Sequence, residues 1–334
     1  MQHADVIVVG GGPAGSTCAW KLVQAGLDVL VLDRAEFPRT KLCAGWITPE
    51  VVDDLEIDLE QYPHRLLSFE RLEFNWGSVR FRKRTVQHSI RRYEFDDWLL
   101  KRSGATVVRH KVKDIECRDG GYVVDGEYAA RWLVGAGGTA CPVYRQLFAE
   151  RSPRDSALQI ATYEQEFPYD WRTRECKLWF FDNGLPGYAW YVPKANGYLN
   201  IGLGGKADSI KAKGGRIKDY WQRFVERLDA EQLVQGHDWE PSGYSYYLRG
   251  RSASVREGNA FIVGDAVGLA SVDMGEGIGP AVRSALAAAR AITGQAEYTL
   301  AQVGRYSVPG FFRRRGMAQI PRSARARGAV ADQR

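Results

Sequence analysis

Cysteine is scarce in this chain, and no side chains stand at metal-ligand spacing. The five cysteines are scattered, odd in number and never spaced as C-x-x-C: Cys18, Cys43, Cys117, Cys141 and Cys176. This pattern argues against a disulfide framework and against a zinc site. The five histidines show no metal spacing and no evident Ser or Cys partner. We therefore expect a reducing compartment and no bound metal, and we assign the histidines no role.

Long apolar runs are also missing. No stretch of about 18 consecutive apolar residues occurs, so we expect no transmembrane helix. The first expected strand starts within five residues of Met1, so we expect no signal peptide. Both observations favour a cytoplasmic location, and attachment to a membrane surface remains compatible with them.

Acidic residues are almost missing from the C-terminal end. The formal net charge is +6, yet residues 305–334 hold eight arginines and one aspartate, so the rest of the chain is nearly neutral. A basic end of this kind contacts anionic lipid or nucleic acid, or is simply solvated, and we favour the solvated interpretation. No stacking module or zinc knuckle supports nucleic-acid binding, so we expect no nucleic-acid partner.

The strongest positive signal is a glycine-rich turn near the N-terminus. Residues 5–9 form a short apolar, β-branched run, and Gly10, Gly12 and Gly15 follow at G-x-G-x-x-G spacing. The first glycine allows a tight turn, the second leaves room for a pyrophosphate, and the third lets a helix lie close to the strand. Pro13 and Ala14 lie between the second and the third of these glycines.

The segment that follows completes a nucleotide-binding unit. Gly26 is placed to end the helix, and a second apolar strand at residues 29–32 leads to Asp33. An acid at this position accepts a hydrogen bond from a ribose 2′-hydroxyl and repels a 2′-phosphate. These residues predict a dinucleotide site, and they leave open whether FAD or NAD binds.

The order of expected elements predicts an interrupted α/β fold. The chain has 334 residues, which suggests two domains at about 150 residues each. Residues 66–84 alternate as a β-hairpin does, and residues 158–204 are aromatic, alternating and turn-rich, which is typical of an antiparallel sheet. Buried-strand and helix patterns return at residues 259–265 and 281–292. We predict a discontinuous Rossmann-like domain with an inserted, mainly antiparallel β-sheet substrate domain.

The predicted boundaries follow from these changes of pattern. The dinucleotide-binding domain comprises residues 1–65, 85–155 and 250–293, and the substrate domain comprises residues 66–84 and 156–249. Residues 294–334 are expected to form a short helical and basic C-terminal tail.

A second motif lies about 230 residues after the first. Gly264 precedes Asp265 at an expected strand end, where an acid accepts a hydrogen bond from a sugar hydroxyl. Gly275, Gly277 and Ile278 open an alanine-rich helix, whose free N–H groups would stabilise negative charge on a reduced isoalloxazine. A buried turn before a core helix is the alternative, and we favour the flavin because both motifs occur together.

The two motifs together resemble a known family. The VVGGGPAG run at residues 8–15, the Gly264-Asp265 pair and the GEGI run at residues 275–278 resemble FAD-dependent enzymes of the p-hydroxybenzoate hydroxylase type. Within that superfamily the chain most resembles the geranylgeranyl reductase family. The resemblance covers about residues 4–293.

Three further segments support this resemblance. The KLCAG run at residues 41–45 is similar to the K-x-C-G-G segment that the family places beside the flavin. Arg92 opens an R-x-x-F-D run similar to the superfamily's helix start, whose arginine reaches the FAD phosphates. The Y-x-W-x-V-P run at residues 188–193, followed by G-L-G at residues 202–204, resembles the family's substrate-domain signature.

The resemblance implies a set of site residues. It implies that the residues holding FAD are Gly10, Gly12, Pro13, Ala14, Gly15, Asp33, Arg34, Lys41, Ala44, Gly45, Arg92, Gly264, Asp265, Gly275, Gly277 and Ile278. It places Cys43 on the reacting face, where the thiol would donate a proton, form a flavin adduct or hold the ring. A small buried hydrophobe is the alternative for Cys43. Tyr188 and Trp190 would wall an apolar substrate cavity, or belong to an ordinary sheet core.

The implied reaction is reduction of carbon–carbon double bonds in an isoprenoid chain by hydride from reduced flavin. The substrate would be a small-molecule or lipid-like apolar compound, and the electron donor NAD(P)H or ferredoxin. A monooxygenase or halogenase acting on an aromatic substrate is the alternative on the same fold. A non-catalytic flavin redox carrier is the second alternative, because the C-terminal part is short for this family.

Overall fold

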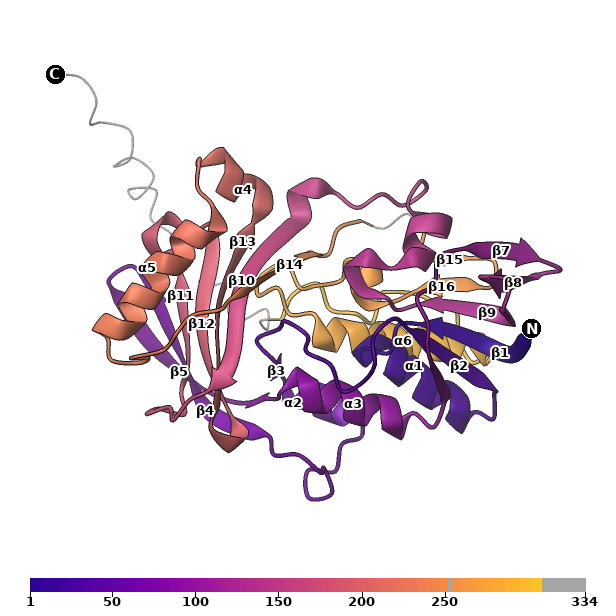
Figure 1. Cartoon of the computed structure of the whole chain (residues 1–334), viewed down its shortest axis with the longest axis horizontal. Helices are drawn as coiled ribbons and strands as arrows, with labels where there is room; N and C mark the ends of the chain where they lie inside the picture. Colours follow the sequence, from indigo (N-terminus) through magenta and orange to yellow (C-terminus); the bar gives the residue numbers. More distant parts are fainter. Residues whose placement is uncertain (252–253, 308–334) are drawn as a thin grey trace.

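Two eight-stranded sheets form two lobes of the molecule (Figure 1). This computed structural model describes residues 1–251 and 254–307 of the chain. The first sheet is mostly parallel and the second mostly antiparallel, which confirms the predicted fold class. The basic end at residues 308–334, on which the lipid and solvation hypotheses depend, lies outside the described residues.

The first sheet is the Rossmann-like part. Its strands are β1 (Gln2–Val9), β2 (Val29–Asp33), β6 (Thr106–Arg109), β7 (Ile115–Arg118), β8 (Gly121–Val124), β9 (Tyr128–Gly135), β15 (Arg256–Glu257) and β16 (Ala260–Ile262). The order is β15-β16-β9-β1-β2-β6, and β1 pairs in parallel with both β2 and β9. The carboxyl ends of β1 and β2 therefore meet at one edge of the sheet, where α/β folds bind ligands.

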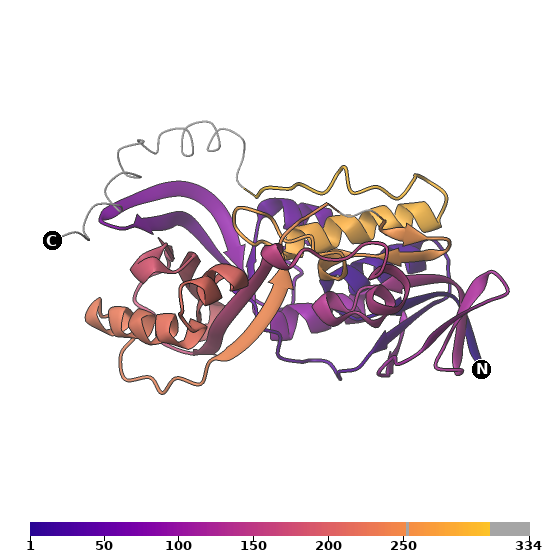
Figure 2. The ribbon, with the colours of Figure 1, turned by 90° about the horizontal axis from the view of Figure 1, so that it is seen from above.

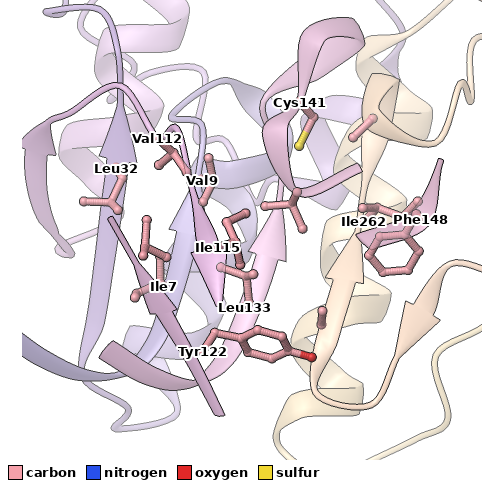
Figure 3. Close-up of a cluster of buried hydrophobic side chains, with 14 of the residues drawn as sticks. Ile7, Val9, Leu32, Val112, Ile115, Tyr122, Leu133, Cys141, Phe148 and Ile262 are labelled. Atoms are coloured by element: carbon pink, nitrogen blue, oxygen red, sulfur yellow. The ribbon is translucent and has the colours of Figure 1, made fainter. Parts of the chain in front are cut away.

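Both faces of this sheet are buried. Val6 and Val8 pack on one face against α1 (Pro13–Gln24) and α6 (Ile278–Ile292). Ile7 and Val9 point to the other face, into a cluster with Leu133 and Cys141 (Figure 3). This period-two alternation with apolar residues on both sides is what a central parallel strand requires. Cys141 is thus a core residue.

Helices around the first sheet bring several segments to its ligand-binding edge. Alanines of α6 lie against α1, and their small side chains allow the two helices to approach closely. α3 (Arg92–Arg102) also contacts α1, and α2 (Pro49–Asp54) contacts α6. No helix among the described residues is both long and apolar enough to cross a lipid bilayer.

The second sheet supplies the other lobe. Its strands are β3 (Trp46–Ile47), β4 (Leu67–Trp76), β5 (Val79–Ser89), β10 (Gln159–Pro168), β11 (Cys176–Phe180), β12 (Gly187–Lys194), β13 (Tyr198–Lys206) and β14 (Ser242–Tyr247). All neighbours in the order β14-β10-β13-β12-β11-β4-β5-β3 are antiparallel except β11 and β4. α4 (Ala207–Ala212) and α5 (Ile217–Ala230) belong to this lobe, away from the N-terminus (Figure 2). α5 packs its apolar side chains on the sheet, which leaves the opposite face free to meet the first lobe.

Several element boundaries differ from those expected. The strand expected at residues 259–265 ends at Ile262, because Gly264 adopts φ +59° and turns the chain. The helix expected from residue 281 begins at Ile278, which makes Gly277 its N-cap. β7, α2 and α4 were not expected. Residues 294–307 form turns and bends without a helix.

Candidate functional site

A cavity of about 770 Å³ lies where the two lobes meet. Gly10 and Asp33, at the carboxyl ends of β1 and β2, line one part of it. Glu164 on β10 and Trp190 on β12 line another part, on the inner face of the second sheet. The cavity therefore spans both lobes, and no single motif forms it.

The glycines of the turn after β1 have two roles: some are required by close backbone packing, and one leaves space in the cavity. Gly10 has φ +109°, and a Cβ there would lie 2.5 Å from the carbonyl oxygen of Ala136. A Cβ at Gly15 would lie 1.8 Å from the Gly10 carbonyl oxygen. Gly12 differs, because its φ of −74° suits any residue and its Cβ would meet only Arg39 Nη2, at 3.6 Å. The fold thus needs Gly10 and Gly15, whereas Gly12 keeps space open in the cavity.

The N-terminus of α1 points to this open space. The helix starts at Pro13, no side chain caps it, and Gly12, Pro13 and Ala14 all line the cavity. The first N–H groups of an uncapped helix carry partial positive charge and have no partner within the helix. Such an end is a binding site for a phosphate group.

Two arginines lie beside this helix end. Arg92 forms a bidentate ion pair with Asp96, with N···O distances of 2.6 and 2.7 Å. Arg39 Nη1 lies 3.1 Å from Asp96 Oδ2, but it is buried and makes no hydrogen bond with the described residues. Both arginines line the cavity. Two guanidinium groups at a cavity that also receives a helix N-terminus fit a pyrophosphate, the group that a dinucleotide would place there.

The charge of Arg92 is secured by its neighbours. Burial alone would lower the pKa of its guanidinium, but Asp96 and then Cys43 raise it above its ordinary value. Arg92 therefore stays charged at every working pH. Its side chain also brings positive charge close to the Cys43 thiol.

Asp33 is held by the backbone around it. Its Oδ2 accepts a hydrogen bond from the Gly11 N–H at 2.7 Å, and its Oδ1 accepts one from the Ala35 N–H at 2.8 Å. Each carboxylate oxygen has a further acceptor site. Asp33 and the neighbouring Arg34 line the cavity, so the carboxylate is positioned to accept from a sugar hydroxyl.

The second motif forms another part of the wall. Asp265 lines the cavity, and burial raises the pKa of its carboxyl group, with Lys41, Arg92 and Arg154 acting in the opposite direction. The N-terminus of α6 lies next to it, since a Cβ at Gly277 would be 3.4 Å from Asp265 Oδ1. Gly277 caps α6 without a side-chain hydrogen bond. Glu276 Oε1 accepts a hydrogen bond from the Gly279 N–H in the first turn of α6 at 3.0 Å. The start of a second helix, with Asp265 beside it, thus faces the cavity.

The loop before β3 carries Cys43. The thiol is half-buried, lines the cavity, and accepts a hydrogen bond from the Gly45 N–H at 3.4 Å. Lys41 Nζ lies 3.3 Å from the ring centroid of Tyr244. Lys194 Nζ on β12 donates to the Ala44 carbonyl oxygen at 2.8 Å and to the Ile90 carbonyl oxygen. Lys194 therefore ties this loop to the second sheet.

The two aromatic residues of the expected substrate signature lie on the inner face of the second sheet. Tyr188 and Trp190 both line the cavity, together with Leu72, Phe74 and Leu178. The Tyr188 hydroxyl donates to the Met274 carbonyl oxygen, and Trp190 Nε1 donates to Asn200 Oδ1 at 2.7 Å. Their polar atoms are thus satisfied, and their rings present an apolar wall.

The structure brings nearly all the expected site residues together. All of them line this cavity except Gly15 in the first turn of α1, Gly45 in the loop before β3, and Gly264 after β16. Sequence reasoning missed several residues that also line it: Arg39, Thr139, Glu164, Tyr244 and Tyr246. Only strand alternation could have pointed to Glu164, since it shares a face of β10 with Thr162. In the described part of the chain, no group of three or more His, Cys, Asp or Glu side chains is placed to hold a metal.

Comparison with known proteins identifies sequence relatives of this chain. The family model described as FAD dependent oxidoreductase matches residues 5–98. An uncharacterized protein of Methanosarcina barkeri is 30% identical over 311 residues, which cover 88% of this chain and 75% of the relative. Menaquinone reductase of Mycobacterium tuberculosis is 29% identical (83% and 73% covered). Geranylgeranyl diphosphate reductase of Rhodobacter capsulatus is 26% identical (82% and 71% covered).

Solved structures share the fold. A geranylgeranyl bacteriochlorophyll reductase-like protein of Thermoplasma acidophilum superposes with a TM-score of 0.75 at 20% identity, covering 95% of this chain and 83% of that one. A mutant of the halogenase PltM, solved in complex with FAD, gives a TM-score of 0.69 at 17% identity, covering 87% and 69%. The two-lobed fold is thus shared with a reductase-like protein and with a halogenase. The family model and the sequence relatives, several of them named as reductases of geranylgeranyl compounds, show that the chain belongs to the FAD-dependent oxidoreductases.

Proposed function

We propose that this protein uses FAD to reduce carbon–carbon double bonds in an apolar isoprenoid chain. One observation carries the proposal: a single cavity joins the helix end and arginines that suit a pyrophosphate to an aromatic and aliphatic wall. Relatives named for the reduction of menaquinone and of geranylgeranyl diphosphate support this substrate class.

The residues that would hold FAD follow from the cavity. The N-terminus of α1, with Arg39 and Arg92, would bind the pyrophosphate, and Asp33 would accept from the adenosine ribose. Asp265 and the N-terminus of α6 would face the flavin end, where a helix dipole favours negative charge. Reduced FAD supplies a hydride for transfer to an alkene carbon.

The remaining residues of the cavity would orient the substrate and exclude water. Tyr188, Trp190 and Leu178 present apolar surface that suits a prenyl chain. Cys43 lies on a loop that the second sheet anchors, so its thiol would be held at a constant place beside the reacting groups. An apolar, closed surface favours reduction because it keeps water away from the reactive flavin.

A reconstitution experiment tests this proposal. The purified protein is loaded with FAD, reduced anaerobically with dithionite, and offered geranylgeranyl diphosphate or menaquinone. We expect re-oxidation of the flavin at 450 nm and a product that has gained two hydrogen atoms per reduced double bond. NADH, NADPH and reduced ferredoxin are then compared as electron donors under turnover.

The same preparation separates the alternatives. Flavin-dependent halogenases share the fold, and an enzyme of the oxygen-using kind would consume oxygen in a substrate-stimulated reaction and release a hydroxylated or halogenated aromatic product. That result would overturn the reductase proposal. Reducible FAD with no conversion of either prenyl substrate would favour a redox carrier and would equally contradict the proposal.

A further inference from the structure

Glu164 is a buried carboxyl group in the cavity that the proposed flavin site does not use. Its side chain lies on β10 and is 2% exposed, yet it lines the cavity. Burying a charged carboxyl group is costly unless it is paired and hydrogen-bonded. No basic side-chain nitrogen among the described residues lies within 4.0 Å of the Glu164 carboxylate, so no ion pair offsets the cost of ionising it.

Glu164 is held in place by a neutral partner. Asn200 Nδ2 on β13 donates to Glu164 Oε2 at 3.2 Å and to the Cys43 carbonyl oxygen at 3.4 Å. The same amide accepts from Trp190 Nε1 through its oxygen, which fixes its orientation. Asn200 therefore links the carboxyl group to the loop that carries Cys43 and to the apolar wall.

The neighbouring strand β13 has a glycine opposite Glu164, which leaves space for the Glu164 side chain. Gly202 pairs with Glu164 across β10 and β13. A Cβ at Gly202 would lie 2.7 Å from the Cβ of Glu164 and 2.2 Å from Trp190. A side chain at this position would displace one of the two. The glycine thus allows the carboxyl group and the indole to share the same end of the cavity.

The titratable groups around Glu164 come from several elements. They comprise Glu166 on β10, Tyr188 and Lys194 on β12, Tyr246 on β14, and Lys41 on the loop before β3. Cys43 on the same loop is linked to Glu164 through Asn200. Burial raises the pKa of Glu164 to about 7, while Asn200, Lys41 and Lys194 act in the opposite direction. An acid that titrates near the working pH transfers a proton most efficiently.

We propose that Glu164 is the catalytic acid that delivers the proton to the alkene, with Asn200 as its positioning residue. This inference rests on the proposed reductase function. A hydride from reduced FAD would form a C–H bond at one alkene carbon. The π electron pair of the alkene would form a second C–H bond, at the other carbon, with the proton of Glu164. The Glu164 O–H bond breaks, and water reprotonates the carboxylate. Re-reduction of FAD consumes NAD(P)H or reduced ferredoxin.

Substitutions of Glu164 test the proposal in the FAD-loaded enzyme. In single-turnover reduction of geranylgeranyl diphosphate, the wild-type rate should fall as pH rises through about 7. Glu164→Gln should slow the step by about 100-fold or more and abolish this pH dependence, because the amide has no proton to give. Glu164→Asp should keep the pH dependence and recover part of the rate. Glu226→Gln, which makes the same change at an exposed acid on α5, is the control and should keep the wild-type profile.

A second readout does not depend on turnover. Urea unfolding of the FAD-free protein should show Glu164→Gln more stable than wild type at pH 8.5 and equal to it near pH 4.5, since only the wild type must ionise a buried carboxyl. Absorbance at 450 nm should show normal FAD content in the variant.

The outcomes separate this proposal from the one on which it rests. A wild-type enzyme that reduces no prenyl substrate overturns the reductase function and this role with it. An active wild type and a Glu164→Gln variant with the same rate and pH profile overturn only the role of Glu164. A variant that slows the step yet keeps the pH limb also contradicts the proposal, because a structural role would have that effect.

Discussion

Cys43 has two interpretations: its thiol takes part in the reaction, or it only fills space as a small buried residue. Its thiol is half-buried at the cavity wall, accepts a hydrogen bond from the Gly45 N–H and packs partly against the core around α2 and α3. It is therefore both a wall residue and a packing residue. Its role in the reaction stays a prediction.

Replacing Cys43 by alanine separates those roles. We expect Cys43→Ala to retain FAD and to slow alkene reduction, because the thiol that faces the cavity is lost while the loop keeps its anchor at Lys194. Single-turnover rates and absorbance at 450 nm measure the two effects. Cys117→Ala, at an exposed cysteine, is the control and should match wild type. Full activity in Cys43→Ala would remove this residue from the mechanism.

Glu164 also makes the stability of the protein depend on pH. Its pKa in the folded state is about 7, above the value of 4.5 that it has when unfolded. Its favourable contribution is therefore present below pH 4.5 and is lost as pH rises through 7. This difference in pKa corresponds to a loss of about 3 kcal/mol in the free energy of unfolding at high pH. Urea denaturation of wild type and Glu164→Gln between pH 4.5 and 8.5 should reveal a gap that opens over this range; a constant gap would contradict the shifted pKa.

At the scale of elements, two helix N-termini define the ends of the proposed flavin site. Each has a glycine at the N-cap, Gly12 in α1 and Gly277 in α6. No side chain caps α1, whereas Glu276 accepts a hydrogen bond from the Gly279 N–H in the first turn of α6. The sequence predicted a helix behind each of the two glycine motifs. It placed the second three residues late, because the alanine-rich pattern becomes regular only after Pro280.

Gly12 tests whether the start of α1 is built for a ligand. Its backbone accepts any residue, and a side chain would enter the cavity rather than the core. Gly12→Val should therefore lower the free energy of unfolding by less than about 1 kcal/mol while it abolishes FAD binding. Circular dichroism melts and FAD titration measure the two quantities.

Gly15→Ala provides the contrast for that prediction. Its Cβ would collide with the Gly10 carbonyl oxygen, so the variant should lose stability whether or not FAD is present. If Gly12→Val bound FAD as tightly as wild type, the pyrophosphate would have to lie elsewhere in the cavity.

At the scale of the whole molecule, a few polar contacts join the two lobes around the cavity. Lys194 on β12 is fully buried, donates to the carbonyl oxygens of Ala44 and Ile90, and pairs with Glu166 at 3.4 Å. Burial lowers the pKa of its ammonium group, and Glu166 opposes that shift. Lys194 thus holds the Cys43 loop in the position from which it lines the cavity.

Removing the Lys194 ammonium group should weaken the attachment of the Cys43 loop to the second sheet. Lys194→Met would leave the carbonyl oxygens of Ala44 and Ile90 without their buried donor, so we expect a loss of about 2 kcal/mol or more in the free energy of unfolding. FAD affinity should fall as well, because the loop before β3 would lose its anchor. Urea denaturation and FAD titration measure both. Lys206→Met, at an exposed lysine on β13, should stay within about 0.5 kcal/mol of wild type.

The fold class and the family were predictable because their signals are local. The glycine turn, the helix behind it and Asp33 depend on backbone geometry within about 30 residues, and spacing in the sequence records that geometry directly. The same holds for the Gly264-Asp265 pair and the GEGI run. The exact division into domains, and the role of each site residue, stay predictions.

Sequence alone thus determined that the chain carries two nucleotide-binding motifs around an inserted antiparallel sheet. Only the tertiary structure decided which other side chains meet those motifs. Arg39 approaches Gly12, and Asn200 joins Glu164 to the Cys43 loop, through contacts between residues 27 to 157 positions apart. Such contacts depend on strand order and on the packing of one lobe against the other, and no local spacing encodes either. The physical reason is that a motif specifies its own backbone, whereas a cavity is made by surfaces that only the folded chain brings together.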